Sequence, residues 1–215
     1  MTALFKTKVC GITSVADAKM CCAAGVDAIG LNFYDESPRC ITVSQAVEIV
    51  AAVGNDIQIV GLFVNHAVEN VRAIQRELGL QYIQLHGDED PGYLRQLKDL
   101  PLIKAFRCRE NQTVEIVDFL AACTTLDITL QAILLDAFQP GCYGGSGKRL
   151  DWETLKTRNH SFGGIDGYWL VEWMRTMLLQ RSPWRVQRQS TLPAVLRLHR
   201  EQRMPNWCSD LLQVP

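Results

Sequence analysis

The feature that most constrains the fold is a unit that recurs six times between residues 7 and 155. Each unit holds a short apolar run rich in β-branched residues, a loop, and an amphipathic stretch of helical length. The apolar runs are continuous rather than alternating, which is typical of strands covered on both faces. Strict strand–helix alternation predicts parallel strands joined by right-handed crossovers. Six such units in so short a stretch favour a compact barrel over an open sheet.

The pattern places each element along the chain. We expect strands at Thr7–Cys10, Ala28–Phe33, Gln58–Val64, Tyr82–Leu85, Leu102–Phe106 and Ala132–Asp136, and helices near 14–24, 43–53, 67–78, 90–99 and 112–122. Helix starts are indicated by Ser14 with Asp17, by Thr42 or Ser44, and by Asp90-Pro91. In either a barrel or an open sheet, functional residues lie at the carboxyl ends of the strands.

Composition excludes several function classes. The chain has 215 residues and a formal net charge of −1, so its overall charge favours neither nucleic acid nor an acidic partner. No apolar run is long enough to span a bilayer, and the first residues lack the apolar core of a signal peptide. The eight cysteines lack zinc spacing. We therefore expect a cytoplasmic protein with reduced thiols, no metal and no membrane contact.

Two strand ends carry candidate acid–base groups. Cys10 closes the first expected strand and precedes Gly11 and a helix start, a setting in which a thiol can act as a base. Asp136 closes the sixth strand, and a carboxyl group in an apolar pocket suits a general acid. Each residue taken alone has a plain alternative, a small core cysteine and a loop-capping aspartate. Together they predict proton-transfer chemistry that needs neither a metal nor a redox cofactor.

Three further loops hold candidate binding groups. Arg39 follows the second strand and can clamp a carboxylate, whereas His86 ends the fourth strand and can donate to a substrate oxygen. Asp88 and Glu89 are expected in the first turn of the next helix. A glycine-rich loop after the sixth strand can cradle an oxyanion with its backbone N–H groups and lacks the spacing of the nucleotide P-loop. Its candidate residues are Gly144, Gly145, Ser146 and Gly147.

Taken in order, several segments carry a specific resemblance. They are KVCGIT, GVDAIGLNFYDESPRCI, IVGLFVN, IQLHGDE, IKAFR, and ILLDAF followed by YGGSGKRLDW. Over residues 7 to about 166 the chain resembles the phosphoribosylanthranilate isomerase family of tryptophan biosynthesis. The resemblance implies an α/β fold, the (β/α)8 TIM barrel. It also implies an enzyme that acts on a small phosphosugar, as a monomer or homodimer, without a cofactor.

The resemblance also implies roles by position. Asp136 would protonate the ribose ring oxygen and open the ring, and Cys10 would remove the C2 proton of the resulting Schiff base. Arg39 would contact the anthranilate carboxylate, and His86 would line the same pocket. The product would be the 1-deoxyribulose phosphate of an Amadori rearrangement.

The chain changes character after Asp166. Residues 167–215 hold four of the five tryptophans and seven arginines against three acids, and they contain no run that predicts a strand. The family's phosphate-binding segments, which resemble LAGGL and DVSSGVE, are missing. A reading frame shifted by one base permits LAGGMDADNVAAAIA from Tyr168 and VDVASGVETA from Gln189. We therefore interpret residues 1–166 as a barrel domain of six units and residues 167–215 as an out-of-frame basic tail.

This interpretation predicts an incomplete barrel that is poorly stable and weakly active or inactive. Two other interpretations remain. The neighbouring barrel enzyme indole-glycerol-phosphate synthase works through lysine and glutamate, which fits Cys10 and Asp136 poorly. A degenerate, non-enzymatic barrel would use its basic tail to bind nucleic acid or another partner, with salt-sensitive affinity.

Overall fold

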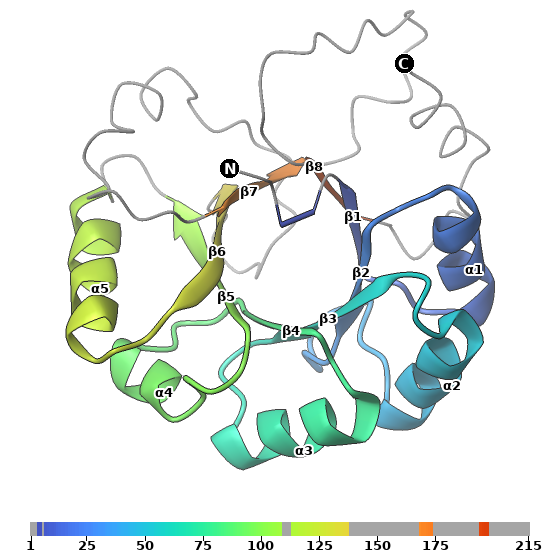
Figure 1. Ribbon diagram of the computed structural model, residues 1–215, viewed down its shortest axis with the longest axis horizontal. Helices are drawn as coiled ribbons and strands as arrows, with labels where there is room; N and C mark the ends of the chain where they lie inside the picture. The colour runs from blue at the N-terminus through green and yellow to red at the C-terminus, as the bar shows by residue number, and fades with distance from the viewer. Residues whose placement is uncertain (1–3, 6, 109–112, 138–167, 174–193, 198–215) are drawn as a thin grey trace, which may run out of the picture.

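The computed structural model describes residues 4, 5, 7–108, 113–137, 168–173 and 194–197. A ring of parallel strands forms its centre, and helices pack around the outside of the ring (Figure 1). The strands are β1 (Thr7–Cys10), β2 (Ala28–Asn32), β3 (Gln58–Phe63), β4 (Tyr82–Leu85), β5 (Leu102–Cys108), β6 (Leu130–Ala137), β7 (Tyr168–Trp173) and β8 (Ala194–Arg197). The helices are α1 (Val15–Ala23), α2 (Val43–Val53), α3 (Val68–Leu78), α4 (Pro91–Arg95) and α5 (Thr113–Thr125).

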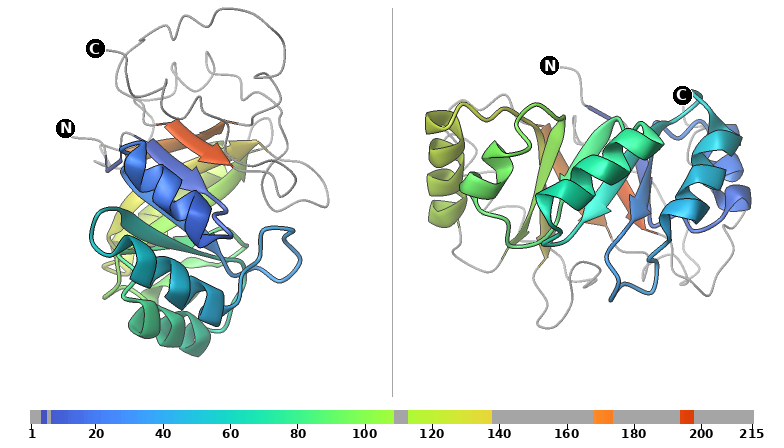
Figure 2. Two further views of the ribbon diagram at one scale, coloured as in Figure 1. Left: turned by 90° about the vertical axis from the view of Figure 1, so that its right-hand side faces the viewer. Right: turned by 90° about the horizontal axis from the view of Figure 1, so that it is seen from below.

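The strands follow one another around the barrel in chain order, and β8 pairs with β1. Every pair is parallel, so the carboxyl ends of all strands meet at one rim. The two side views show the helices on the outer side of the sheet (Figure 2). The six strands and five helices expected from the sequence ahead of residue 138 are confirmed.

Local signals explain where the helices begin. The Ser14 hydroxyl accepts from the Asp17 N–H at 3.1 Å, and Thr42 forms a capping box at the start of α2. Asp90 caps α4, with Pro91 in its first turn. Helix α4 ends at Arg95, earlier than expected, and turns lead from there to Pro101. Beyond Arg95 the backbone hydrogen bonds span three residues rather than four, from the Gln96 N–H to the Tyr93 carbonyl at 3.0 Å and from the Leu97 N–H to the Leu94 carbonyl at 2.9 Å, which tightens the chain into turns.

Two short strands in the segment after Asp166 correct one expectation. The sequence predicted no strand there, yet Tyr168–Trp173 pairs with β6, and Ala194–Arg197 pairs with both β7 and β1. The open edges of β6 and β1 offer unpaired backbone groups, and two short pieces of modest β-propensity pair with them. The barrel is therefore closed by eight strands. The remainder of 167–215 lies outside the described residues.

Alternation along the strands separates two apolar layers. One layer fills the barrel interior and includes Cys10, Ala28, Val60, Leu62, Ile103, Ala105, Ala132 and Leu134. The other lies between strands and helices and includes Ile29, Ile59, Phe63, Ile83 and Leu102. Parallel strands covered on both faces require such continuous apolar runs, as the sequence pattern indicated.

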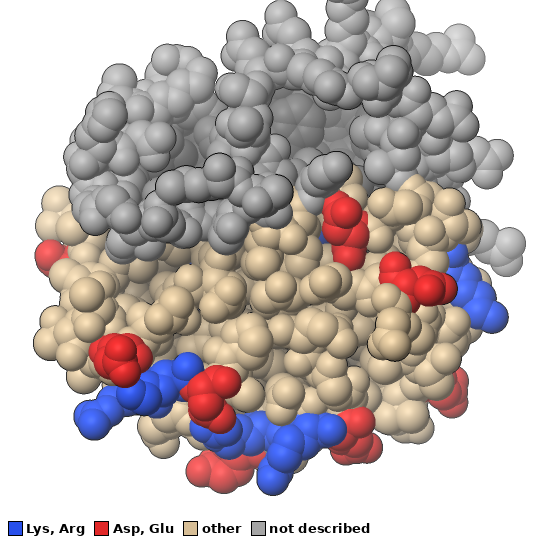
Figure 3. All heavy atoms as spheres, in the orientation of Figure 1, with Lys and Arg blue, Asp and Glu red and all other residues tan. Residues whose placement is uncertain are grey.

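On the visible face, acidic and basic side chains lie next to one another along the helices (Figure 3). None of the described helices is both long and apolar enough to cross a membrane.

Candidate active site

Cys10 lies at the carboxyl end of β1 and faces the barrel interior. Its side chain is buried among the interior apolar residues. The chain turns immediately afterwards, because the N–H groups of Gly11 and Ile12 both donate to the Gly30 carbonyl, at 2.9 and 3.1 Å. Gly11 has a φ of 84°, in the left-handed region that favours glycine. The strand thus ends by presenting a thiol to the interior of the barrel.

Arg39 is carried over Cys10 by a loop that follows β2. The Ser37 hydroxyl accepts from the Asn32 side chain at 2.8 Å and from the Arg39 N–H at 3.2 Å. The Arg39 guanidinium donates to the Cys10 carbonyl at 3.5 Å, and its side chain passes so close to Gly11 that a Cβ there would lie 2.6 Å from Cδ. The structure therefore brings Arg39 and Cys10 together at the rim.

His86 directly follows β4, and its backbone N–H donates to the Phe63 carbonyl at 2.8 Å. Its side chain is buried, and Nδ1 lies 3.1 Å from Nε2 of Gln84. The Gln84 Oε1 in turn accepts from Nζ of Lys8 at 3.0 Å. Sequence reasoning missed Lys8 and Gln84. The available signal was a polar residue inside each of two otherwise apolar strands.

Asp136 lies near the end of β6, opposite Arg107 of β5 in the register. Its position follows the alternation of Ala132 and Leu134, which line the interior. Cys10 and Asp136 therefore occupy equivalent places on two strands of one barrel, although the Asp136 side chain lies outside the described residues. The candidate residues Gly144, Gly145, Ser146 and Gly147 also lie outside the described residues.

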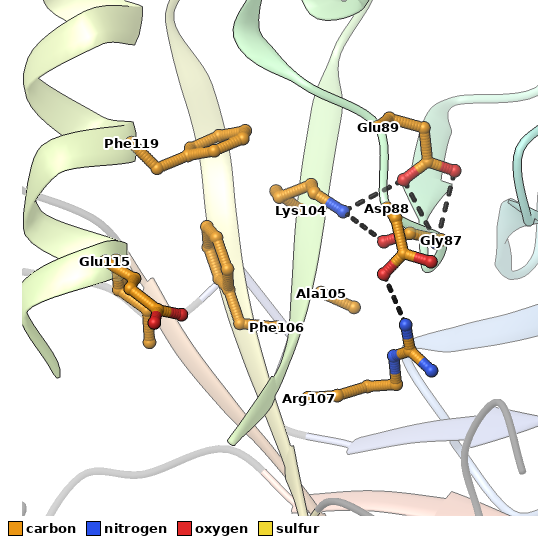
Figure 4. Close-up of a pocket in the computed structure, with 10 residues that line it drawn as sticks. Gly87, Asp88, Glu89, Lys104, Ala105, Phe106, Arg107, Glu115 and Phe119 are labelled. Atoms are coloured by element: carbon orange, nitrogen blue, oxygen red, sulfur yellow. Dashed lines mark hydrogen bonds and ion pairs between the residues drawn. The ribbon is translucent and has the colours of Figure 1, made fainter. Parts of the chain in front are cut away.

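A buried ion pair supports the loop that carries His86 (Figure 4). Nζ of Lys104 donates to the Glu89 carboxylate at 2.9 Å and to the Gly87 carbonyl at 2.8 Å. The same carboxylate accepts from the Asn65 N–H at 2.9 Å and from the Gly87 N–H at 3.0 Å. One carboxylate thereby ties the loops after β3 and β4 to β5.

These contacts correct the expectation that Asp88 and Glu89 are first-turn acids of the next helix. Glu89 is buried against Lys104, and Asp88 pairs with Arg107. Burial lowers the pKa of Lys104 below its ordinary value, and the adjacent Glu89 carboxylate opposes that shift. The sequence suggested two solvated charges because the partners lie on β5, more than ten residues later.

A cavity of about 300 Å³ adjoins this ion pair. It is lined by the β4 loop, β5 and the inner side of α5, with Phe106 and Phe119 among its walls (Figure 4). Cys10, Arg39 and His86 do not line it. Arg107, which lies opposite Asp136 in the register, does line it.

The profile of one protein family, N-(5'-phosphoribosyl)anthranilate (PRA) isomerase, matches residues 7–167. The chain belongs to this family. The N-(5'-phosphoribosyl)anthranilate isomerase of Neisseria gonorrhoeae is 43% identical over 150 residues, which are 70% of this chain and 69% of that protein. The PRA isomerase match ends where the composition of the chain changes.

Solved PRA isomerase structures share the architecture. The crystal structure of the Thermotoga maritima phosphoribosyl anthranilate isomerase has a TM-score of 0.65 and 28% identity, and the match covers 78% of this chain and 76% of that one. A second phosphoribosyl anthranilate isomerase structure contains reduced 1-(o-carboxyphenylamino)-1-deoxyribulose 5-phosphate. It has a TM-score of 0.62 and 26% identity, and the match covers 79% of this chain and 76% of that one.

Proposed function

We propose that the chain catalyses the Amadori rearrangement of N-(5'-phosphoribosyl)anthranilate to 1-(2-carboxyphenylamino)-1-deoxyribulose 5-phosphate, in tryptophan biosynthesis. The observation that carries the proposal is the Cys10 thiol, buried inside the barrel at the rim, with the Arg39 guanidinium bonded to the backbone carbonyl of the same residue. The phosphosugar bound in the related structure supports a substrate of this class. The proposal includes a cytoplasmic enzyme that is a monomer or homodimer.

The reaction needs one acid and one base on opposite sides of the sugar. Asp136 gives its proton to the ribose ring oxygen, the C1–O bond breaks, and the anthranilate nitrogen forms a Schiff base with C1. The Cys10 thiolate then removes the C2 proton, and the electron pair moves to give an enolamine. Tautomerisation to the ketone places a proton on C1, so the product is an isomer of the substrate. No electrons are exchanged with a second reactant.

Two other groups bind the aromatic half of the substrate in this proposal. Arg39 offers a forked guanidinium to the anthranilate carboxylate, which suits planar two-point recognition. His86 lines the same pocket from the end of β4. Gly144, Gly145, Ser146 and Gly147 supply backbone N–H groups for an oxyanion of the substrate.

The test is turnover of phosphoribosylanthranilate, followed by the loss of its anthranilate fluorescence. We expect Cys10→Ala and Asp136→Ala each to lower kcat by at least about 100-fold, the usual contribution of general acid–base catalysis. Cys21→Ala is the matched control. Cys21 is buried in the apolar layer between strands and helices, away from the barrel interior. Equal losses in all three variants would show that the effect is one of folding, and unchanged turnover in the first two would refute the assigned roles.

We also propose that residues 167–215 are the out-of-frame translation of the last two β-α units. The family match stops at residue 167, which supports this. In the shifted frame, LAGG begins at Tyr168, where β7 begins, and VDVASGVETA from Gln189 overlaps β8. The chain as it stands would therefore keep its acid–base pair and lack the family's phosphate-binding loops.

One inserted base tests the frame proposal. A T placed after the Asp166 codon restores the shifted frame, and we expect activity to rise by at least about 100-fold as the substrate becomes correctly held. Coding DNA whose second frame lacks LAGG and a DVASGVE-like segment would refute the proposal. Salt-sensitive nucleic-acid binding by the unaltered chain, lost when residues 167–215 are removed, would favour the non-enzymatic alternative.

A further inference from the structure

Three buried polar side chains form a continuous chain across the barrel interior. They are Lys8 on β1, Gln84 on β4 and His86 at the end of β4, and their exposed fractions are 0%, 1% and 1%. Nζ of Lys8 lies 3.0 Å from Oε1 of Gln84, and Nε2 of Gln84 lies 3.1 Å from Nδ1 of His86. Such burial excludes bulk water from these contacts, so the donors and acceptors must match one another.

Because Lys8 can only donate, it fixes which atom donates and which accepts in both hydrogen bonds of the Lys8–Gln84–His86 network. A lysine ammonium group has three donors and no acceptor, so the Gln84 atom that faces Lys8 must be the carbonyl oxygen. The amide nitrogen of Gln84 then faces His86, and an amide nitrogen can only donate. Nδ1 of His86 must therefore accept, which leaves it without a proton.

We propose that Lys8 is a positioning residue that, through Gln84, holds His86 as the neutral tautomer with its proton on Nε2. The ring then presents an N–H donor from Nε2, while Nδ1 is committed to the Gln84 amide. Which ring nitrogen of a histidine carries the proton is set by the hydrogen bond of the other nitrogen. The tautomer rests on the geometry alone. Its use, donation to an oxygen of the anthranilate half of the substrate, rests on the proposed function.

The tight packing around Lys8 keeps its ammonium group in place. A Cβ built on Gly30 would lie 3.1 Å from Nζ of Lys8 and 2.8 Å from Sγ of Cys10. Gly30 on β2 therefore leaves just enough space for the lysine to cross the interior toward β4. A side chain at that position would displace the ammonium group and release Gln84.

The test is long-range ¹H–¹⁵N NMR spectroscopy of the histidine rings in the full, ¹⁵N-labelled chain. The chain has four histidines, and the His86→Gln variant identifies the signals of His86. In the wild type we expect the Nε2–H tautomer alone. A wild-type His86 that carries its proton on Nδ1 would overturn the proposal without any variant.

Substitutions of Gln84 and Lys8 test the two hydrogen bonds separately, and a substitution of Lys98 serves as the control. Gln84→Glu replaces the amide with an acceptor of the same shape, so Nδ1 of His86 is expected to gain a proton. Lys8→Met frees the Gln84 amide to turn, and a mixture of tautomers is expected. Lys98→Met removes an exposed lysine that pairs with Asp127 and is expected to leave the His86 signals unchanged. An unchanged tautomer in folded Gln84→Glu protein would overturn the proposal. Because the readout is spectroscopic, it is independent of isomerase turnover.

Discussion

Removal of the Glu89 carboxylate is expected to lower the free energy of unfolding strongly. The side chains of Lys104 and Glu89 are 3% and 1% exposed. In Glu89→Ala, the buried ammonium group keeps the Gly87 carbonyl and loses its counter-ion, while the N–H groups of Asn65 and Gly87 lose their acceptor. An unpaired buried charge costs about 3–5 kcal/mol, and the unsatisfied N–H of the buried Gly87 costs roughly 1–3 kcal/mol, whereas Asn65 is exposed and its N–H can bind water.

Together these terms approach the whole stability of an ordinary domain, about 5–15 kcal/mol. Lys104→Met is the informative comparison, because Glu89 would still accept from Asn65 and Gly87. We therefore expect Lys104→Met to cost less, roughly 2–4 kcal/mol, with the remaining carboxylate charge as the main penalty. The double variant Glu89→Gln with Lys104→Met removes both charges, so it should be more stable than Glu89→Ala.

The assay is urea unfolding of the full chain, followed by circular dichroism. A second readout is the pH dependence of the free energy of unfolding. Burial already lowers the pKa of Lys104, and loss of Glu89 removes the nearest group that opposes this. Between the folded and unfolded pKa values the unfolded chain binds more protons, so the stability of Glu89→Ala rises with pH toward about 10.5. A smaller loss for Glu89→Ala than for Lys104→Met, or a double variant that is no more stable than Glu89→Ala, would refute this reasoning.

Three other changes test separate parts of the structure. Gly30→Ala places a methyl group 2.8 Å from Sγ of Cys10, and we expect urea unfolding to give a stability loss of about 1–3 kcal/mol; an unchanged midpoint would refute the close approach. Lys8→Met should raise the pH at which iodoacetamide half-maximally alkylates Cys10. Nζ of Lys8 and Sγ of Cys10 lie 3.1 and 2.8 Å from the same point, the Cβ that Gly30 lacks, and a cation so close favours the thiolate. Mass spectrometry of the Cys10 peptide measures this, and an unchanged profile would count against it. Burial, assisted by Glu89, raises the pKa of Tyr93 to about 12, so the unfolded tyrosine ionises first and stability falls above pH ~10. Tyr93→Phe should weaken that loss between pH 9 and 11, and an identical loss in both proteins would contradict the assignment.

Periodicity of the amino-acid sequence is sufficient to locate β1 to β6, because parallel strands buried on both faces need continuous apolar runs. The same rule placed Cys10 and Asp136 at strand ends on one rim, since all parallel strands point the same way. Side-chain capping is equally local, and Ser14 and Asp90 start the expected helices. These features depend on residues within a few positions of one another.

The two strands after Asp166 could not be located from the sequence pattern. The sequence of this segment lacks the pattern of a barrel strand, yet two short pieces pair with the open edges of β6 and β1. Edge pairing uses backbone groups, so it requires a modest β-propensity rather than a particular sequence. The presence of strands in this segment therefore depends on the six that precede it.

By itself, the sequence determined the order of the barrel units, the family, and the two strand ends that carry a thiol and a carboxyl group. Only the tertiary structure decided the partners of the buried charges: Lys8 meets Gln84 from 76 residues away, and Glu89 meets Lys104. A charged residue inside a strand looks the same in sequence whether it faces water or the barrel interior. Closure of the ring brings distant strands together, and burial then makes each polar contact obligatory.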